Sequence, residues 1–131
     1  MPTILVIDDN QDDREFLKII LEDAGYGVIE APEGKSGAQL YRQHPCDLVI
    51  IDIFMPEQDG LETILELKRQ FPDVRIIAVS GGGTYVFRSE NSGVAMALES
   101  AKAFGAEYVI QKPVRSNHLL ATVQAVVPLE R

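Results

Sequence analysis

Short, continuous apolar runs alternate with longer amphipathic segments along the whole chain. The runs lack the polar alternation of a half-exposed strand, which is typical of strands buried on both faces of a parallel sheet. The five expected strands are Thr3–Ile7, Val28–Ala31, Leu48–Ile51, Val74–Val79 and Tyr108–Ile110.

Between these runs, apolar residues recur at helical spacing, and glycines such as Gly25 and Gly105 follow helical segments as C-terminal stops. The order strand–helix, repeated five times, predicts right-handed crossovers with helices on both faces of one sheet. We therefore expect residues 1–131 to form a single α/β domain. The helices are expected around Phe16–Ala24, Ala38–Tyr41, Leu61–Leu65, Val94–Ala101 and Leu119–Val127.

Composition and charge narrow the class of protein. Among 131 residues, Asp and Glu number 20 against 12 Lys and Arg, a formal net charge of −8. Such a chain repels nucleic acid and anionic membranes, so we expect no direct binding to either. No apolar run reaches the roughly 18 residues of a membrane span, and no signal peptide is visible. The single cysteine, Cys46, excludes an internal disulfide, and we expect a cytoplasmic protein.

Polar residues of complementary type follow four of the expected strands. Asp8 and Asp9 follow the first strand, Asp52 the third and Ser80 the fourth, while Lys112 lies just beyond the fifth. Ligands of open α/β sheets bind beyond the carboxyl ends of the strands. We therefore expect these five side chains to converge on one edge of the sheet.

This set of side chains favours phosphoryl transfer to a carboxylate. Three clustered carboxylates repel one another unless a cation joins them, and an all-oxygen cluster suits Mg²⁺. Lys112 adds positive charge and Ser80 adds a hydrogen-bond donor. Aspartate is an accepted nucleophile in such reactions, which depend on positioning and on charge neutralisation.

The motifs that carry these residues resemble the receiver domain of two-component response regulators. They are Ile7-Asp8-Asp9-Asn10, Ile51-Asp52-Ile53-Phe54-Met55-Pro56, Asp59-Gly60, Val79-Ser80-Gly81 and Lys112-Pro113. The resemblance covers nearly the whole chain in the same order. It implies a flavodoxin-like (βα)5 fold with a parallel sheet in the order 2-1-3-4-5.

The resemblance also implies residue roles. Asp52 would accept the phosphoryl group, and Asp9, assisted by Asp8, would bind Mg²⁺ together with Asp52 and the backbone carbonyl of Phe54. On activation, Ser80 (with Gly81 beside it) and Lys112 would contact the phosphoryl group. The donor would be a histidine kinase or a histidine phosphotransfer protein, and the output would pass to an unknown protein target. The chain would be a switch rather than an enzyme acting on other molecules. The resemblance does not decide between a monomer and a homodimer.

Four further residues are expected to shape the backbone around the site. Asp59 and Gly60 form a turn that begins the third helix, and Pro56 belongs to the same connection. Pro113 suggests a fixed peptide bond, cis or trans, that aims Lys112.

Two features depart from the receiver pattern. Many receivers carry Tyr or Phe three residues before the lysine, where this chain has Val109; Tyr108 lies one residue earlier and, by strand alternation, on the opposite face. The segment 81–93 is much longer than the usual two to six residues of a strand–helix connection. Within it, Tyr85 and Phe87 either fold onto the core or form a docking patch that phosphorylation alters.

Three other functions compete with the switch. An aspartyl phosphatase usually has a second carboxylate two residues after the nucleophile, where Phe54 stands. A flavin-binding module needs a phosphate-cradling loop after the first strand, where Asp8 and Asp9 would repel the anion. A pseudo-receiver would only bind partners, which the intact set of Asp52, Ser80 and Lys112 disfavours.

Overall fold

The sheet is built from the apolar runs, and its strands alternate with helices along the chain. The computed structural model describes residues 2–53, 60–80 and 99–129. Its elements are β1 (Thr3–Ile7), α1 (Gln11–Asp23), β2 (Gly27–Ala31), α2 (Gly34–Gln43), β3 (Leu48–Asp52), α3 (Gly60–Gln70), β4 (Ile76–Ser80), β5 (Tyr108–Gln111) and α6 (Ser116–Val126). Residues 99–104 are also helical.

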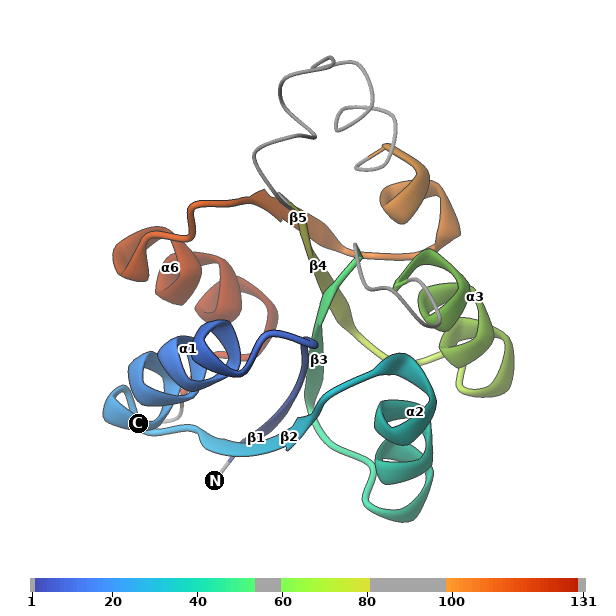
Figure 1. The fold of residues 1–131 in the computed structure, drawn as a ribbon, viewed down its shortest axis with the longest axis horizontal. Coiled ribbons are helices and arrows are strands. Elements are labelled where there is room, and N and C mark those ends of the chain that lie inside the picture. Colours follow the sequence, from blue (N-terminus) through green and yellow to red (C-terminus); the bar gives the residue numbers. More distant parts are fainter. Residues whose placement is uncertain (1, 54–59, 81–98, 130–131) are drawn as a thin grey trace.

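The five strands are all parallel and lie in the order β2-β1-β3-β4-β5, so the predicted fold class is confirmed. Figure 1 shows the sheet running through the middle of the molecule, with α1 and α6 on one face and α2 and α3 on the other. The orange helix of residues 99–104 lies on the side of α3. Each crossover therefore covers a face of the sheet, as the buried strands require.

Successive side chains of each central strand enter two separate cores. In β1, Leu5 and Ile7 pack under α2 and α3, whereas Ile4 and Val6 pack under α1 and α6. The strands β3 and β4 alternate in the same way, and all five residues of each are buried. This two-sided burial explains why β3 and β4 contain no polar residue before Asp52 and Ser80 at their carboxyl ends.

The fourth strand begins later than the sequence predicts. Val74 is buried but lies in a turn, because its N–H donates to the Phe71 carbonyl and its own carbonyl accepts from Lys68 Nζ at 2.6 Å. The strand starts at Ile76, and its last residue is Ser80, which was expected to follow it. Local hydrogen bonding therefore overrides the apolar pattern at Val74, while the side chain still packs into the core.

The edge strand β5 carries the expected reversal of side-chain direction. Val109 packs against the core under α2 and α3, and Ile110 enters the core under α1 and α6. Tyr108 precedes Val109 and is 44% exposed. The aromatic ring is therefore on the surface, and the aliphatic residue fills the interior.

Gly60 lets the start of α3 approach the end of β3. A Cβ atom at this position would lie 2.5 Å from the carbonyl oxygen of Asp52 and would also collide with Ile53 Cα. The glycine N–H instead donates to the Ile53 carbonyl at 3.3 Å. Backbone atoms cannot yield as a flexible side chain can, so only glycine fits beside Asp52.

Replacing Gly60 with alanine should destabilise the fold. We expect Gly60→Ala to lower the free energy of unfolding by about 1–3 kcal/mol, because α3 must move away from β3. Urea denaturation measures this change. Arg69→Ala, at an exposed position of the same helix, serves as the control and should change stability by less than about 0.5 kcal/mol. Equal effects of the two substitutions would contradict the packing argument.

Candidate functional site

Four strand ends bring the predicted polar residues to one edge of the sheet. Asp8 directly follows β1, and its N–H donates to the Ala31 carbonyl of β2. Asp52 ends β3 and Ser80 ends β4, and the Lys112 N–H donates to the Ser80 carbonyl at 2.6 Å. Continued ladder hydrogen bonds therefore place these residues.

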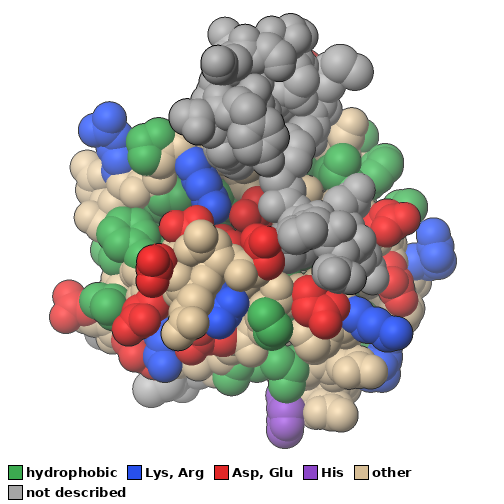
Figure 2. Space-filling model, viewed as in Figure 1, with side chains coloured by type: hydrophobic (Ala, Val, Ile, Leu, Met, Phe, Trp, Pro, Cys, Tyr) green, Lys and Arg blue, Asp and Glu red, His purple; other side chains and the backbone are tan. Residues whose placement is uncertain are grey.

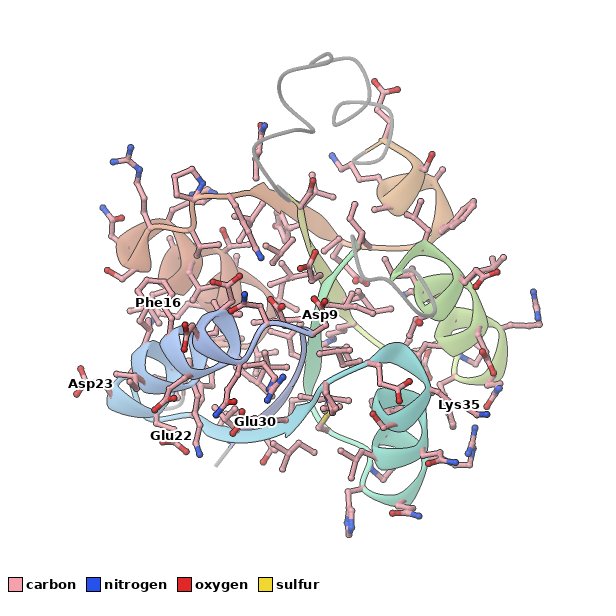
Figure 3. All side chains as sticks on the ribbon, viewed as in Figure 1. Asp9, Phe16, Glu22, Asp23, Glu30 and Lys35 are labelled. Atoms are coloured by element: carbon pink, nitrogen blue, oxygen red, sulfur yellow. The ribbon has the colours of Figure 1, made fainter. Side chains whose placement is uncertain are left out.

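An acidic cluster forms there from Asp8, Asp9 and Asp52. One carboxylate oxygen of each lies within 4.8 Å of the others. Asp8 and Asp52 are buried, at 1% and 5% exposure, whereas Asp9 is exposed. Figure 3 shows Asp9 over the centre of the molecule at the end of the sheet, and Figure 2 shows acidic side chains gathered on this face. The cluster is thus open to solvent on one side.

The buried carboxyl of Asp8 is held in an unfavourable charged form. Burial is the largest cause and raises the pKa of Asp8 from 3.8 to about 6; the charges of Asp52 and Asp13 act in the same direction. A hydrogen bond from the Asn10 N–H, at 2.9 Å, and the charge of Lys112 oppose the rise. A further cation in the cluster would relieve this cost.

Lys112 is the cation that enters the cluster from β5. Its Nζ lies 2.8 Å from Asp13 Oδ2, 3.3 Å from Asp52 Oδ2 and 3.6 Å from Asp8 Oδ2. Partial burial works against the ammonium, but the hydrogen bond to Asp13 and the charges of Asp52 and Asp8 outweigh it and raise the pKa of Lys112. Lys112 therefore stays protonated. The peptide bond between Lys112 and Pro113, for which the sequence suggested a fixed conformation, is cis.

Ser80 presents an unsatisfied hydroxyl at the end of β4. The residue is fully buried, and its Oγ has no hydrogen-bond partner among the described residues. A buried hydroxyl without a partner costs free energy, so such groups are rare in folded proteins. A ligand that brings an acceptor oxygen to this edge would satisfy it.

Two residues that the sequence analysis did not single out hold the site in place. Arg14 Nη1 donates to the Asp8 carbonyl at 2.7 Å, and its Nε pairs with Glu30 of β2 at 3.3 Å. Asp13 pairs with Lys112, while Asn10 caps α1 by accepting from the Asp13 N–H. Arg14 and Asp13 lie in the first turn of α1, so their proximity to the acidic pair was the available signal.

Several predicted residues fall outside the described ranges. These are Phe54, Pro56, Asp59, Gly81, Tyr85 and Phe87. Among the predicted residues that are described, Asp8, Asp9, Asp52, Ser80 and Lys112 share the sheet edge, Gly60 begins α3 beside Asp52, and Tyr108 and Val109 lie in β5.

Comparison with known proteins agrees with this geometry. A family model described as the response regulator receiver domain matches residues 4–124. The chain belongs to this family. Receiver domains are signalling domains that interact with histidine kinases and bind Mg²⁺ in an acidic pocket.

Curated relatives of this receiver domain include both single-domain and longer proteins. The chain is 33% identical over 124 residues to the chemotaxis protein CheY of Thermotoga maritima, covering 94% of this chain and 95% of that protein. It is 35% identical over 123 residues to the response regulator GtcR of Aneurinibacillus migulanus, covering 94% of this chain. It spans only 46% of the length of GtcR.

Solved structures show the same fold. The receiver domain of NtrX from Brucella abortus superposes with a TM-score of 0.83 at 27% identity, covering 97% of this chain and 99% of that one. CheY4 of Vibrio cholerae gives 0.80 at 26% identity, covering 97% and 99%. None of the helices in the described residues has the length and apolarity that a membrane crossing needs.

The residues present fit a magnesium ion. The three carboxylates of the cluster provide the oxygen ligands that Mg²⁺ prefers, and the exposed side at Asp9 leaves room for its waters. Burial and the charges of neighbouring carboxylates raise the pKa of Asp8, and a bound divalent cation would favour its charged form.

Neutralising Asp8 should stabilise the metal-free protein, and more so at high pH. The pKa of Asp8 is about 6 in the folded protein and 3.8 ordinarily, so folding requires burying a charge once Asp8 ionises. The free energy of unfolding is therefore highest below pH 4 and falls as the pH rises toward 6. In EDTA, Asp8→Asn should therefore gain roughly 1 kcal/mol near pH 4.5 and up to about 3 kcal/mol at pH 8.

Urea unfolding at the two pH values measures this difference. Asp12→Asn, an exposed substitution in the first turn of α1, controls for the loss of one charge and should show no such pH dependence. A gain for Asp8→Asn that is the same at both pH values would contradict the burial argument.

Proposed function

We propose that this receiver domain is a Mg²⁺-dependent switch that accepts a phosphoryl group on Asp52. The carrying observation is that the buried Asp52 carboxylate lies within 4.8 Å of the carboxylates of Asp8 and Asp9 and accepts a hydrogen bond from Lys112 Nζ at 3.3 Å. Among the three carboxylates of the cluster, Asp52 is the one that ends β3, the strand paired with β4, whose last residue is Ser80.

The reaction is an in-line transfer from a phosphohistidine. One oxygen of Asp52 forms a bond to phosphorus while the P–N bond breaks, and the imidazole leaves with the electron pair. The donor is a histidine kinase or a histidine phosphotransfer protein. Bound Mg²⁺ supplies charge neutralisation for the phosphoryl oxygens.

The remaining side chains receive the new group. The phosphoryl oxygens bring a charge of about −1.5 to −2, which attracts the Lys112 ammonium through charge-assisted hydrogen bonds. The Ser80 hydroxyl, which is buried at the same edge without a partner among the described residues, donates to another phosphoryl oxygen. Asp8, Asp9 and Asp52 would hold the metal, and the resemblance to receivers implies the carbonyl of Phe54 as a further ligand. The gain of the Ser80 contact links phosphorylation to the segment that follows β4, where altered contacts with a protein target carry the output.

Phosphorylation should occur at Asp52 and need the metal. Incubation with acetyl phosphate and Mg²⁺ should add one phosphate to the wild type, seen as an increase in intact mass, and none to Asp52→Asn. Asp23→Asn is the matched control, because Asp23 is exposed at the far end of α1 (Figure 3). Labelling of Asp52→Asn, or undiminished labelling in EDTA, would refute the assignment.

The same labelling, combined with a phosphatase assay, separates the switch from two of the competing functions. A pseudo-receiver takes up no phosphate, whereas an aspartyl phosphatase releases inorganic phosphate from a non-physiological monoester such as p-nitrophenyl phosphate through many turnovers. A switch retains the phosphate on the chain and turns over only at the rate of its own hydrolysis.

Removing the Ser80 hydroxyl should separate stability from phosphoryl recognition. Because Oγ lacks a partner among the described residues, Ser80→Ala should be neutral or stabilising by up to about 1 kcal/mol. It should nevertheless weaken the binding of beryllofluoride, a phosphoryl mimic, by about tenfold, since a hydrogen bond to a charged oxygen is lost.

Titration of beryllofluoride in the presence of Mg²⁺, followed by NMR, measures the affinity. Ser116→Ala, at the exposed start of α6, should change neither quantity. Destabilisation of Ser80→Ala by several kcal/mol would show that the hydroxyl has a structural partner, and an unchanged beryllofluoride affinity would show that its recognition role is wrong.

A further inference from the structure

One ammonium group is shared between the phosphoacceptor and a residue of α1. Among the three carboxylates around Lys112 Nζ, the shortest distance is to Asp13 Oδ2, at 2.8 Å, and the distance to Asp52 Oδ2 is 3.3 Å. The contact joins residues 99 positions apart in sequence, so it belongs to the tertiary structure and not to the local turn.

The carboxylate of Asp13 is turned toward Lys112 because its local alternative is occupied. Asp13 is the third residue of α1 after the cap Asn10, the place from which an acidic side chain commonly accepts the backbone N–H of the cap. Here that N–H donates to Asp8 Oδ1 at 2.9 Å. Helix capping still operates in one direction, through Asn10 Oδ1 and the Asp13 N–H.

A cavity beside this ion pair gives Asp13 room to move. It has a volume of about 240 Å³, and its lining includes Asp8, Asp13, Phe16, Lys112, Pro113 and Val114. Figure 3 shows Phe16 projecting from α1 on the side of α6. Departure of Lys112 would therefore not trap the Asp13 carboxylate in a packed interior.

The two acids differ in how firmly they can hold the ammonium. The Asp13 side chain is 46% exposed and carries one charge, whereas Asp52 is 5% exposed and acquires further negative charge when phosphorylated. Solvent screens the pair with Asp13 more strongly than the buried pair. Phosphorylation thus moves the balance toward Asp52.

We propose that Asp13 is a positioning residue that holds the Lys112 ammonium on the α1 side of the site before phosphorylation and releases it to the phosphoryl group afterwards. This inference rests on the proposed function of Asp52. The contact with Asp13 must be given up for the new one, so Asp13 opposes the phosphorylated state and favours the resting state. Its removal lowers the cost of activation.

Beryllofluoride titration with Mg²⁺ tests the release. Asp13→Asn should bind beryllofluoride about three- to tenfold more tightly than the wild type, as expected for losing a competing, partly exposed ion pair. Asp12→Asn removes the same charge one residue earlier in the same helical turn, and Asp12 is exposed. It should match the wild type to within about twofold, and equal gains for the two variants would overturn the proposal, since they would reflect net charge alone.

A double-mutant cycle shows whether Asp13 acts through the lysine. In a Lys112→Gln background, which is expected to bind beryllofluoride weakly, Asp13→Asn should have no effect beyond that of Asp12→Asn. A gain of the full three- to tenfold in this background would overturn the proposal, because Asp13 would then act independently of Lys112.

The contact between Asp13 and Lys112 in the resting state can be measured before beryllofluoride is added. NMR of the Lys112 side chain should show its Nζ and Cε resonances displaced by Asp13→Asn and unaffected by Asp12→Asn, and in the wild type beryllofluoride should displace them too. Unchanged Lys112 resonances in Asp13→Asn would overturn the hold. Absence of beryllofluoride binding by the wild type would instead refute the proposed function and the release with it, whereas normal wild-type binding with no gain in Asp13→Asn refutes the present inference alone.

Discussion

The ammonium of Lys112 is the interaction on which the arrangement at this sheet edge depends. It is within 3.6 Å of carboxylate oxygens from three different residues, two of which are buried. Carboxylates this close would raise one another's pKa values and lose their charge without a cation. The lysine offsets this negative charge from the end of a separate strand, which makes the site dependent on the correct assembly of the sheet.

The sheet supplies that assembly through burial on both faces. Residues of β1, β3 and β4 fill both cores, so any shift of register would expose apolar side chains and bury polar ones. Ladder hydrogen bonds continue past the strand ends, from Asp8 to Ala31, from Ile53 to Val79 and from Lys112 to Ser80. Rigid strand ends thus fix backbone positions, while the polar side chains there keep their chemistry.

The edge is less favourable in isolation than the rest of the fold. Asp8 is charged although it is buried, and the Ser80 hydroxyl has no partner among the described residues. Both features are costs that a divalent cation and a phosphoryl group would relieve. The interior of the molecule, with its fully buried aliphatic strands, provides the stability that allows such a site to persist.

Much of this molecule was readable in the order of its residues. Continuous apolar runs predicted the parallel strands, and the residues following them predicted the acidic cluster with Ser80 and Lys112, because parallel strands end at a common edge. The apolar pattern wrongly placed Val74 in a strand, because Val74 is buried like a strand residue although its backbone hydrogen bond belongs to a turn. Periodicity reports whether a side chain is buried, and not which backbone hydrogen bonds its residue makes.

Only the tertiary structure decided how the charges are shared. Asp8 and Asp9 are adjacent and chemically identical, yet one is buried and the other exposed. Arg14 joins the Asp8 carbonyl to Glu30, and Asp13 reaches Lys112 across 99 positions. Such contacts depend on where side chains from separate elements meet in space. The local sequence pattern determined the strands, but it does not specify the distances between side chains that are far apart in the sequence.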